Sequence, residues 1–362
     1  MNRIIIIGNG FDLAHGLKTS YKDFLEWVKN EKITQSPDDY FECVVLPSGN
    51  SYNGTNKLKA SDFFERNYRK PTKLDDFNSN YKGYQFIYKN KFLEYIIRKE
   101  NLKNWVDIEE EYFKYLNKCF GVYVKNMNIN NTATLHQYFE QIKNDLENYL
   151  DKIETGRKFE IKEHLDALVA SKFNEKDFLE ISYKMANFSP EENKPNEILF
   201  LNFNYTALEK YYLGNISNSI SSEQIHIHGK IKDDNNRIIF GYGNENTQEY
   251  KEIEKANNNE FLKNMKSIQY LYTDNYVKLM NFINSDKYQI FIWGHSCGLS
   301  DGTLLKALFE HDNCFSIKPF YHKKDDSTDN YGDIVMNISR HFSDKTYFRN
   351  KVVNKKYCEE LG

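Results

Sequence analysis

One short stretch of the chain has the spacing of a catalytic serine turn. Gly294-His295-Ser296-Cys297-Gly298 reads G-x-S-x-G, the pattern in which α/β-hydrolases hold a nucleophile between a strand and a helix. That chemistry needs a helix directly after Ser296. Here the next helix is expected only from about Thr303, capped by Ser300 or Asp301. An α/β-hydrolase with Ser296 as nucleophile is therefore kept as a minor alternative.

A second turn, Gly8-Asn9-Gly10-Phe11-Asp12, follows a run of four isoleucines. Glycines at the end of a strand let the backbone approach an anionic ligand, and the next helix points its amide groups at that ligand. The turn is incomplete as a dinucleotide fingerprint, because Leu13 occupies the position of the third glycine. An ordinary strand-to-helix turn is the alternative.

Two further strand ends carry polar side chains. Asn204 follows the apolar segment 198–201, where its carboxamide can hold a water molecule or a ribose hydroxyl, or can cap the next helix. His226-Ile227-His228-Gly229 places two imidazoles on one face of a strand. They suggest a metal site without an identifiable third ligand, a general base at His228, or a buried structural histidine.

A parallel sheet would bring these four motifs together. Strands are predicted at 4–7, 198–201, 225–228, 238–240, 288–293 and 315–320, the last at a sheet edge because it contains a proline. From about 85 to 186, apolar residues recur at helical spacing. The sequence thus predicts an α/β fold with a Rossmann-like parallel sheet in residues 1–30 and 190–362, and a mainly helical insertion in residues 31–189.

The composition argues against several classes of protein. The net charge is −3, so the chain lacks the excess of basic residues that is typical of a nucleic-acid binder. The five cysteines are scattered without a C-x-x-C pair, which argues against a zinc ribbon and fits a reducing compartment. The N-terminal apolar run is too short for a signal peptide, and no later segment could span a membrane. We expect a cytoplasmic protein with no metal, no membrane association and no nucleic-acid partner.

Taken in order, four segments resemble the bacteriophage abortive infection AbiH family. They are IIIIGNGFDLAHGLKTSYKDF, LFLNFNYTALE, IHIHG with IIFGYGNEN, and IFIWGHSCGLSD. A fifth, Trp105-Val106-Asp107-Ile108-Glu109, lies in the predicted insertion and also resembles the family. The resemblance implies an anti-phage protein, with a second copy of the chain and a phage-derived trigger as candidate partners.

The same segments are more distantly similar to sirtuin-like NAD-binding proteins. The correspondences are Gly8-Asn9-Gly10 with their glycine turn, Asn204 with the asparagine of T-x-N-x-D, His228-Gly229 with their H-G pair, Gly294 and Ser296 with their G-x-S, and Gly16, Tyr21 and Phe24 with the loop that covers the cofactor. Deacetylating sirtuins usually carry a four-cysteine zinc module, which this chain lacks. The similarity therefore implies NAD hydrolysis rather than deacetylation.

The implied reaction is cleavage of the nicotinamide–ribose bond, with NAD as substrate. Asn204 would position water or the ribose, His228 would act as base, and Asp12 completes the implied catalytic set. Asp12 stands where those proteins have serine, and Thr206 where they have aspartate, so Asp12 is expected to bind a ribose hydroxyl, to pair with a base or to carry a proton. The implied cofactor-binding residues are Gly8, Asn9, Gly10, Phe11, His15, Gly16, Tyr21, Phe24, Gly229, Gly294, His295, Ser296 and Asp301.

Two alternatives remain besides NAD hydrolysis and the α/β-hydrolase with Ser296 as nucleophile. One is a non-catalytic defence module whose sheet senses a nucleotide while the insertion contacts a partner. The other is a metal-dependent hydrolase of nucleotides or nucleic acid at His226 and His228.

Overall fold

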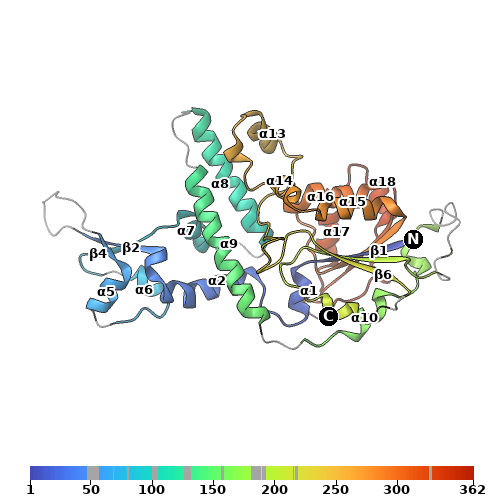
Figure 1. Cartoon of the computed structure of the whole chain (residues 1–362), viewed down its shortest axis with the longest axis horizontal. Coiled ribbons are helices and arrows are strands. Elements are labelled where there is room, and N and C mark those ends of the chain that lie inside the picture. Colours follow the sequence, from blue (N-terminus) through green and yellow to red (C-terminus); the bar gives the residue numbers. More distant parts are fainter. Residues whose placement is uncertain are drawn as a thin grey trace.

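The computed structural model describes residues 1–46, 57–67, 69–79, 81–99, 105–125, 132–155, 159–180, 189, 193–214, 216, 219–325 and 328–362. Figure 1 shows two parts joined along one side: a sheet with helices on both faces, and a mainly helical part that contains the long helices α8 (Trp105–Lys125) and α9 (Thr132–Glu154).

The larger sheet is entirely parallel. Its strands are β1 (Asn2–Ile7), β5 (Glu197–Asn202), β6 (Ser221–His226), β7 (Tyr288–Trp293) and β8 (Cys314–Phe320), in the spatial order β6-β5-β1-β7-β8. The chain therefore moves outward from β1 in one direction and then in the other, which is the arrangement of doubly wound α/β sheets. The predicted α/β class with a parallel sheet is confirmed, and β8, with its proline, lies at an edge.

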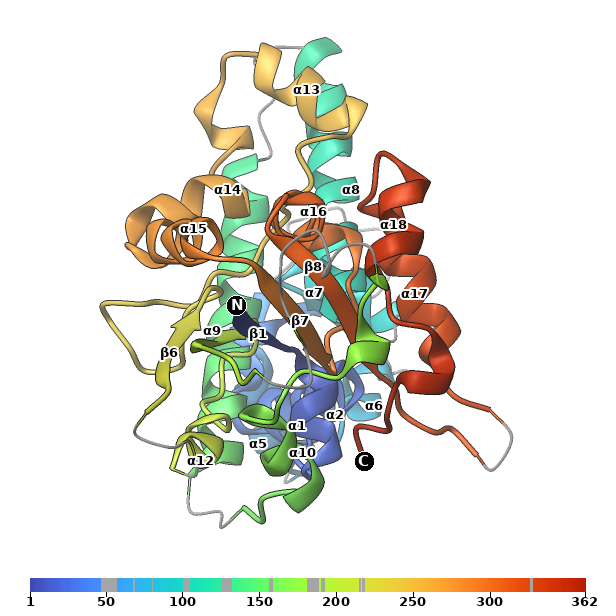
Figure 2. The ribbon, with the colours of Figure 1, turned by 90° about the vertical axis from the view of Figure 1, so that its right-hand side faces the viewer.

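The isoleucine run explains why β1 is central. All six residues of the strand are buried, and successive side chains point to opposite faces. Ile4 and Ile6 belong to one apolar core, and Ile5 and Ile7 to the other. Figure 2 shows that α15 (Asn275–Ser285), α16 (Gly302–Glu310) and α17 (Tyr331–Arg340) lie on one side of the sheet, and α1 (Asn9–Ala14), α10 (Glu163–Val169) and α12 (Lys210–Leu213) on the other. A strand that is apolar on both faces requires this double cover.

The insertion contains more β-structure than its helical spacing predicts. A three-stranded antiparallel sheet has the order β3-β2-β4, with β2 at Phe41–Val45, β3 at Lys57–Lys59 and β4 at Tyr84–Tyr88. Its helices besides α8 and α9 include α3 (Ile33–Gln35), α4 (Pro37–Tyr40), α5 (Ala60–Arg66), α6 (Asp75–Asn78) and α7 (Lys91–Arg98). Helix α2 (Tyr21–Trp27) precedes the predicted boundary at residue 31 but packs in the same apolar core. Aromatic rings fill the core of this part; Phe41 and Phe77, for example, stack with their ring centroids 4.4 Å apart.

The segment between β6 and β7 packs against both parts of the molecule. It contains α13 (Gln248–Lys255) and α14 (Lys266–Gln269), and its residues from Ile231 to Met265 contribute to the apolar core of the insertion. The remaining elements of the described residues are α18 (Lys345–Lys351), the π-helical η1 (Val28–Lys32), and the 3-10 helices η2 (Glu175–Asp177), η4 (Asn259–Phe261), η5 (Tyr270–Tyr272), η6 (Leu299–Asp301) and η7 (Lys355–Tyr357).

One predicted strand is absent, and the predicted strand 225–228 ends earlier, since β6 stops at His226 and His228 lies in the turn after it. Residues 238–240 form no strand; Ile239 N donates a single backbone hydrogen bond, of 2.8 Å, to the carbonyl of His228. Ile238 and Phe240 pack in the core of the insertion, whereas Ile239 packs in a core of the sheet. The three residues are apolar because the segment lies between two apolar cores. In the sequence, such a segment gives the same apolar run as a strand buried on both faces.

None of the described helices combines the length and the apolar character needed to cross a membrane.

Candidate functional site

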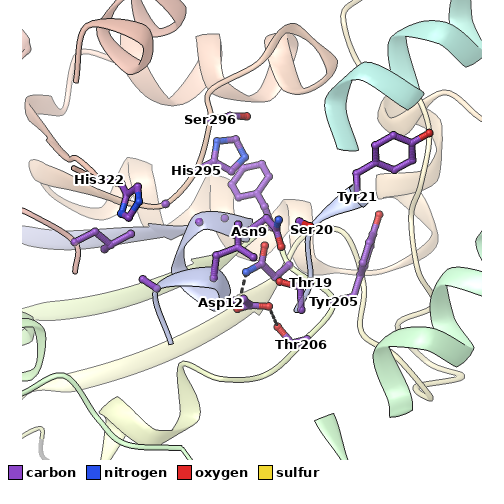
Figure 3. A pocket seen from close by; sticks show the side chains of 18 of the residues that line it. Asn9, Asp12, Thr19, Ser20, Tyr21, Tyr205, Thr206, His295, Ser296 and His322 are labelled. Atoms are coloured by element: carbon purple, nitrogen blue, oxygen red, sulfur yellow. Dashed lines mark hydrogen bonds between the residues drawn. The ribbon is translucent and has the colours of Figure 1, made fainter. Parts of the chain in front are cut away.

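A cavity of about 550 Å³ lies where the strands of the parallel sheet end. Residues that follow β1, β5, β6, β7 and β8 line it, among them Asp12, Asn204, His228, His295 and His322. Figure 3 shows Asp12 and Thr206 on one wall, His295 and Ser296 on another, and Tyr21 and Tyr205 at the end away from His322. The four motifs therefore converge on one cavity, at the edge where open α/β sheets bind their ligands.

Asp12 is held by two residues of the loop after β5. Asn204 Nδ2 donates to Asp12 Oδ1 at 2.9 Å, and Thr206 Oγ1 donates to Oδ2 at 2.6 Å, the latter drawn in Figure 3. Burial raises the pKa of Asp12 to about 7, although both hydrogen bonds act in the opposite direction. The carboxyl group therefore sits near the point where it gains or loses a proton at neutral pH.

A buried hydrogen-bond network holds the Asn204 loop in place. Asn202 Oδ1 accepts the backbone N–H of Asn204 at 2.7 Å, and Asn202 Nδ2 donates to the Thr206 carbonyl at 3.0 Å and to Glu209 Oε2 at 2.6 Å. Glu209 Oε1 lies 2.8 Å from His226 Nε2. These contacts position the two side chains that bind Asp12.

His228 reaches the cavity with one ring nitrogen already in use. Its Nε2 lies 3.0 Å from Asp301 Oδ1 and 3.2 Å from the hydroxyl of Tyr270. Burial, and then the charge of Lys266, lower the pKa of His228 to about 4 in spite of Asp301. The imidazole is therefore neutral, and if Nε2 carries the proton toward Asp301, Nδ1 holds the lone pair.

Lys266 joins Asp301 to the insertion. Its ammonium group donates to Asp301 Oδ1 at 2.7 Å and to Glu109 Oε2, on α8, at 2.9 Å. Lys266 is fully buried; burial opposes its charge, but the two carboxylates outweigh burial and raise its pKa. Burial raises the pKa of Glu109 to about 7 despite Lys266. Burial acts on Asp301 as well, yet Lys266 and His228 hold its pKa well below the ordinary value.

The glycines of the first and last motifs pack against each other. Gly10 N donates to the carbonyl of Gly294 at 2.8 Å, and Gly8 N to the carbonyl of Trp293 at 3.0 Å. A Cβ atom on Gly10 would lie 2.8 Å from Gly294 Cα, and one on Gly8 would lie 2.4 Å from His295 Cα. Both turns line the cavity, but their glycines are required by the close approach of two loops.

The other implied cofactor-binding residues divide into two groups. Those that line the cavity are Gly8, Asn9, Gly10, Tyr21, Gly294, His295, Ser296 and Asp301. Phe11, His15, Gly16, Phe24 and Gly229 lie outside it. Phe11 stacks on Trp293, His15 bonds to the Phe11 carbonyl and the Tyr212 hydroxyl, and Phe24 packs in the core of the insertion. Gly16 and Gly229 have φ angles of +75° and +79° and shape turns.

The serine motif does not form a nucleophile elbow. Positive φ angles occur at Gly294 and Cys297 rather than at Ser296, and the next helical turn, η6, begins only at Leu299. The helix after it starts at Gly302, and Asp301 makes no side-chain cap to it, because its carboxylate binds Lys266 and His228 instead. The expected cap by Asp301 is therefore wrong.

The two histidines of the third motif have separate partners. His226 contacts Glu209, whereas His228 contacts Asp301. Across the part of the chain that the structure describes, no group of three or more His, Cys, Asp or Glu side chains could hold a metal ion.

Several residues of the site have no clear signal in the sequence. Lys266 is a single lysine in a polar stretch, and Tyr270 is one of 27 tyrosines. Thr206 and Glu109 lie in motifs quoted for the family resemblance. Thr206 follows Asn204 by two residues, and Glu109 lies next to the apolar face of α8. These positions could have identified both as residues of the site. The side chains of Trp105 and Val106, in the same motif as Glu109, lie outside the described residues.

Comparison with models of protein families gives a match over most of the chain. The model of a family described as "Bacteriophage abortive infection AbiH" matches residues 4–322. Searches of the curated proteins and of the solved structures give no significant match.

Proposed function

The chain belongs to the bacteriophage abortive infection AbiH family, and we propose that it serves phage defence by hydrolysing NAD at the nicotinamide–ribose bond. The observation that supports this most is the convergence of Asp12, Asn204 and His228 on one cavity at the ends of the parallel strands. Its volume of about 550 Å³ lies in the range of small-molecule sites.

The ribose next to the nicotinamide would bind between Asp12 and Asn204. A carboxylate accepts hydrogen bonds from ribose hydroxyls, as acidic residues do in many dinucleotide sites. Asn204 Nδ2 is used by Asp12, so its carboxamide oxygen is the atom left to accept a bond from a hydroxyl or from the attacking water. As the bond to nicotinamide breaks, the ribose gains oxocarbenium character, and nearby carboxylates stabilise that positive charge.

His228 would take the proton of the attacking water. The oxygen of water forms a bond to the ribose carbon, neutral nicotinamide leaves with the bonding electrons, and Nδ1 of His228 accepts the proton. Asp301 holds the other ring nitrogen and stabilises the imidazolium that forms. A positioned base contributes about a hundred- to ten-thousandfold to the rate, most where its pKa lies near the working pH, so the pKa of about 4 places His228 at the lower end of this range.

The test is incubation of the purified protein with NAD, followed by chromatography for ADP-ribose and nicotinamide. We expect both products from the wild type, and at least about a hundredfold slower turnover in His228→Ala and in Asn204→Ala. His164→Ala is the matched control, because His164 is exposed on α10; it should keep full activity.

Because defence effectors can need a trigger, the same comparison is made in phage-infected cells, where NAD is measured directly. NAD should fall in cells with the wild type and stay constant in cells with His228→Ala. Binding of NAD without product in either setting would identify a nucleotide-binding module instead, and unchanged turnover in His228→Ala would remove the proposed base.

A further inference from the structure

The wall of the cavity carries more negative than positive charge. Glu109 and Asp301 both line it, whereas Lys266, which pairs with both, is not among its lining residues. The two carboxylates and one ammonium leave one negative charge uncompensated when both acids are ionised, and His228 adds no charge because burial lowers its pKa to about 4. Both carboxylates have hydrogen-bond partners, since Gly241 N also donates to Glu109 Oε1 at 3.2 Å. They nevertheless share a single ammonium group, so a cationic ligand would stabilise the excess of buried negative charge.

Aromatic rings surround the same end of the cavity. Phe203, Tyr205 and Phe240 line it, and the ring of Phe203 lies 5.0 Å from that of His228. Burial raises the pKa of Tyr205 well above its ordinary value, and the charges of Glu109 and Asp301 add to this rise. Tyr205 donates from its hydroxyl to the Ile239 carbonyl at 3.1 Å and lines the cavity together with both acids. Faces of aromatic rings attract cations, and more strongly where water is excluded.

The same wall also presents hydrogen-bond acceptors that have no donor. His228 is 5% exposed and Asn204 is 8% exposed. Among the described residues, none hydrogen-bonds to Nδ1 of His228 or to Oδ1 of Asn204. Two acceptors without a donor, on buried residues that line the cavity, indicate a ligand with N–H or O–H donors.

We infer that this end of the cavity is a subsite for a flat, cationic heteroaromatic ring, with Glu109 as the residue that selects the positive charge. The inference deepens the proposed function, since the nicotinamide ring is cationic in oxidised NAD and neutral in NADH. It assigns a role in substrate selection to α8, which lies in the insertion and outside the parallel sheet.

The test uses a pair of small probes that differ in charge. Calorimetric titration of the wild type with 1-methylnicotinamide, a cation, and with nicotinamide, its neutral counterpart, should show about tenfold tighter binding of the cation. Glu109→Gln should reduce this preference to about twofold or less. Glu110→Gln is the matched control, since Glu110 is the next residue of α8 and does not line the cavity; it should keep the preference.

The outcomes test the cationic subsite and the proposed NAD hydrolysis separately. Equal affinity for the two probes, or no binding of either by the wild type, overturns the cationic subsite even if NAD is hydrolysed. A preference that persists in Glu109→Gln overturns the role of Glu109. A clear preference for the cation in a protein that does not hydrolyse NAD leaves the subsite standing and refutes the proposed reaction. The wild-type comparison needs no variant, so a poorly folded Glu109→Gln cannot obscure the result.

Discussion

Asp12 shows how the surroundings of a residue set its chemistry. From the sequence it is a carboxylate in a glycine turn, where a phosphate is expected and would be repelled. In the structure it points to Asn204 and Thr206, and burial raises its pKa to about 7. A group that can give or take a proton at neutral pH suits the recognition of a hydroxyl better than the binding of an anion.

This raised pKa predicts that Asp12→Asn stabilises the protein at alkaline pH. The ordinary pKa of Asp12 is 3.8 and the folded value is about 7, so the folded state holds the proton more tightly. The free energy of unfolding therefore falls as the pH rises between these values. Asparagine cannot ionise, and its amide can still accept from Asn204 and donate to Thr206. By urea denaturation, the variant should gain up to about 4 kcal/mol at pH 8 and much less at pH 5.

Asp38→Asn is the control with the opposite sign. Burial acts on Asp38 too, but hydrogen bonds from Ser61 outweigh it and lower the pKa. Its ionised form stabilises the folded state above the ordinary pKa, so this variant should be less stable than the wild type at neutral pH. A loss of stability in Asp12→Asn at pH 8 would show that Asp12 is a stabilised anion and would contradict the argument.

At the scale of the elements, the site is built by loops that follow parallel strands. The glycines after β1 and β7 suggest a ligand cradle in the sequence, yet in the structure they let these two loops touch. Gly294 has a φ angle of +71°, and a Cβ atom there would lie 2.1 Å from Phe11 N. The close contact brings Asp12 and His295 to the same cavity.

Gly294→Ala should therefore destabilise the protein by roughly 2–4 kcal/mol, since strain at a positive φ angle adds to a clash with backbone atoms. Gly121→Ala is the matched substitution, because Gly121 lies within α8 and a Cβ atom there meets nothing within 4 Å. It should gain about 0.5–1 kcal/mol from helix propensity. The midpoints of thermal unfolding of both variants measure this, and a neutral Gly294→Ala would mean that the loops separate easily.

The sequence predicts the strands that position this site better than the side-chain contacts between its residues. The isoleucine run is apolar without interruption, and Gln289 is the one polar residue in the segment 288–293, so both strands are predictable. The parallel arrangement brings Asp12, Asn204 and His228 to one edge. The partner of His228 is less visible. Asp301 looks like a helix cap, because a cap and a buried ion pair use the same residue type. No periodicity marks Lys266, whose role depends on a contact between distant segments.

For the whole molecule, Lys266 is one of the points at which the insertion meets the parallel-sheet part. It lies on α14, Glu109 on α8 and Asp301 on η6, in three segments far apart in the chain. Lys266 is fully buried. A buried charge that binds two carboxylates fixes the relative position of all three segments, because any displacement would leave an unpaired charge in an apolar environment.

Lys266→Met tests this connection, since methionine keeps most of the length and removes the charge. Glu109 and Asp301 would then face each other without a cation, which should cost about 3–5 kcal/mol at pH 8. At pH 5 the cost should be smaller, because protonation of Glu109, whose pKa is about 7 even beside Lys266, removes the repulsion. Lys266→Met combined with Glu109→Gln should recover part of the loss at pH 8 for the same reason.

Urea denaturation of the single and double variants at both pH values measures these differences. Lys114→Met is the control on α8: its ion pair with Glu111 is exposed on the lysine side, so its loss should change stability by less than about 1 kcal/mol. If the single variant were as stable as the wild type, or if the double variant recovered nothing, the three segments would be held by apolar packing alone. If the double variant regains stability only at alkaline pH, Lys266 suppresses the repulsion between two buried carboxylates. The charge of Glu109 on α8 would then be part of what holds the walls of the cavity in place.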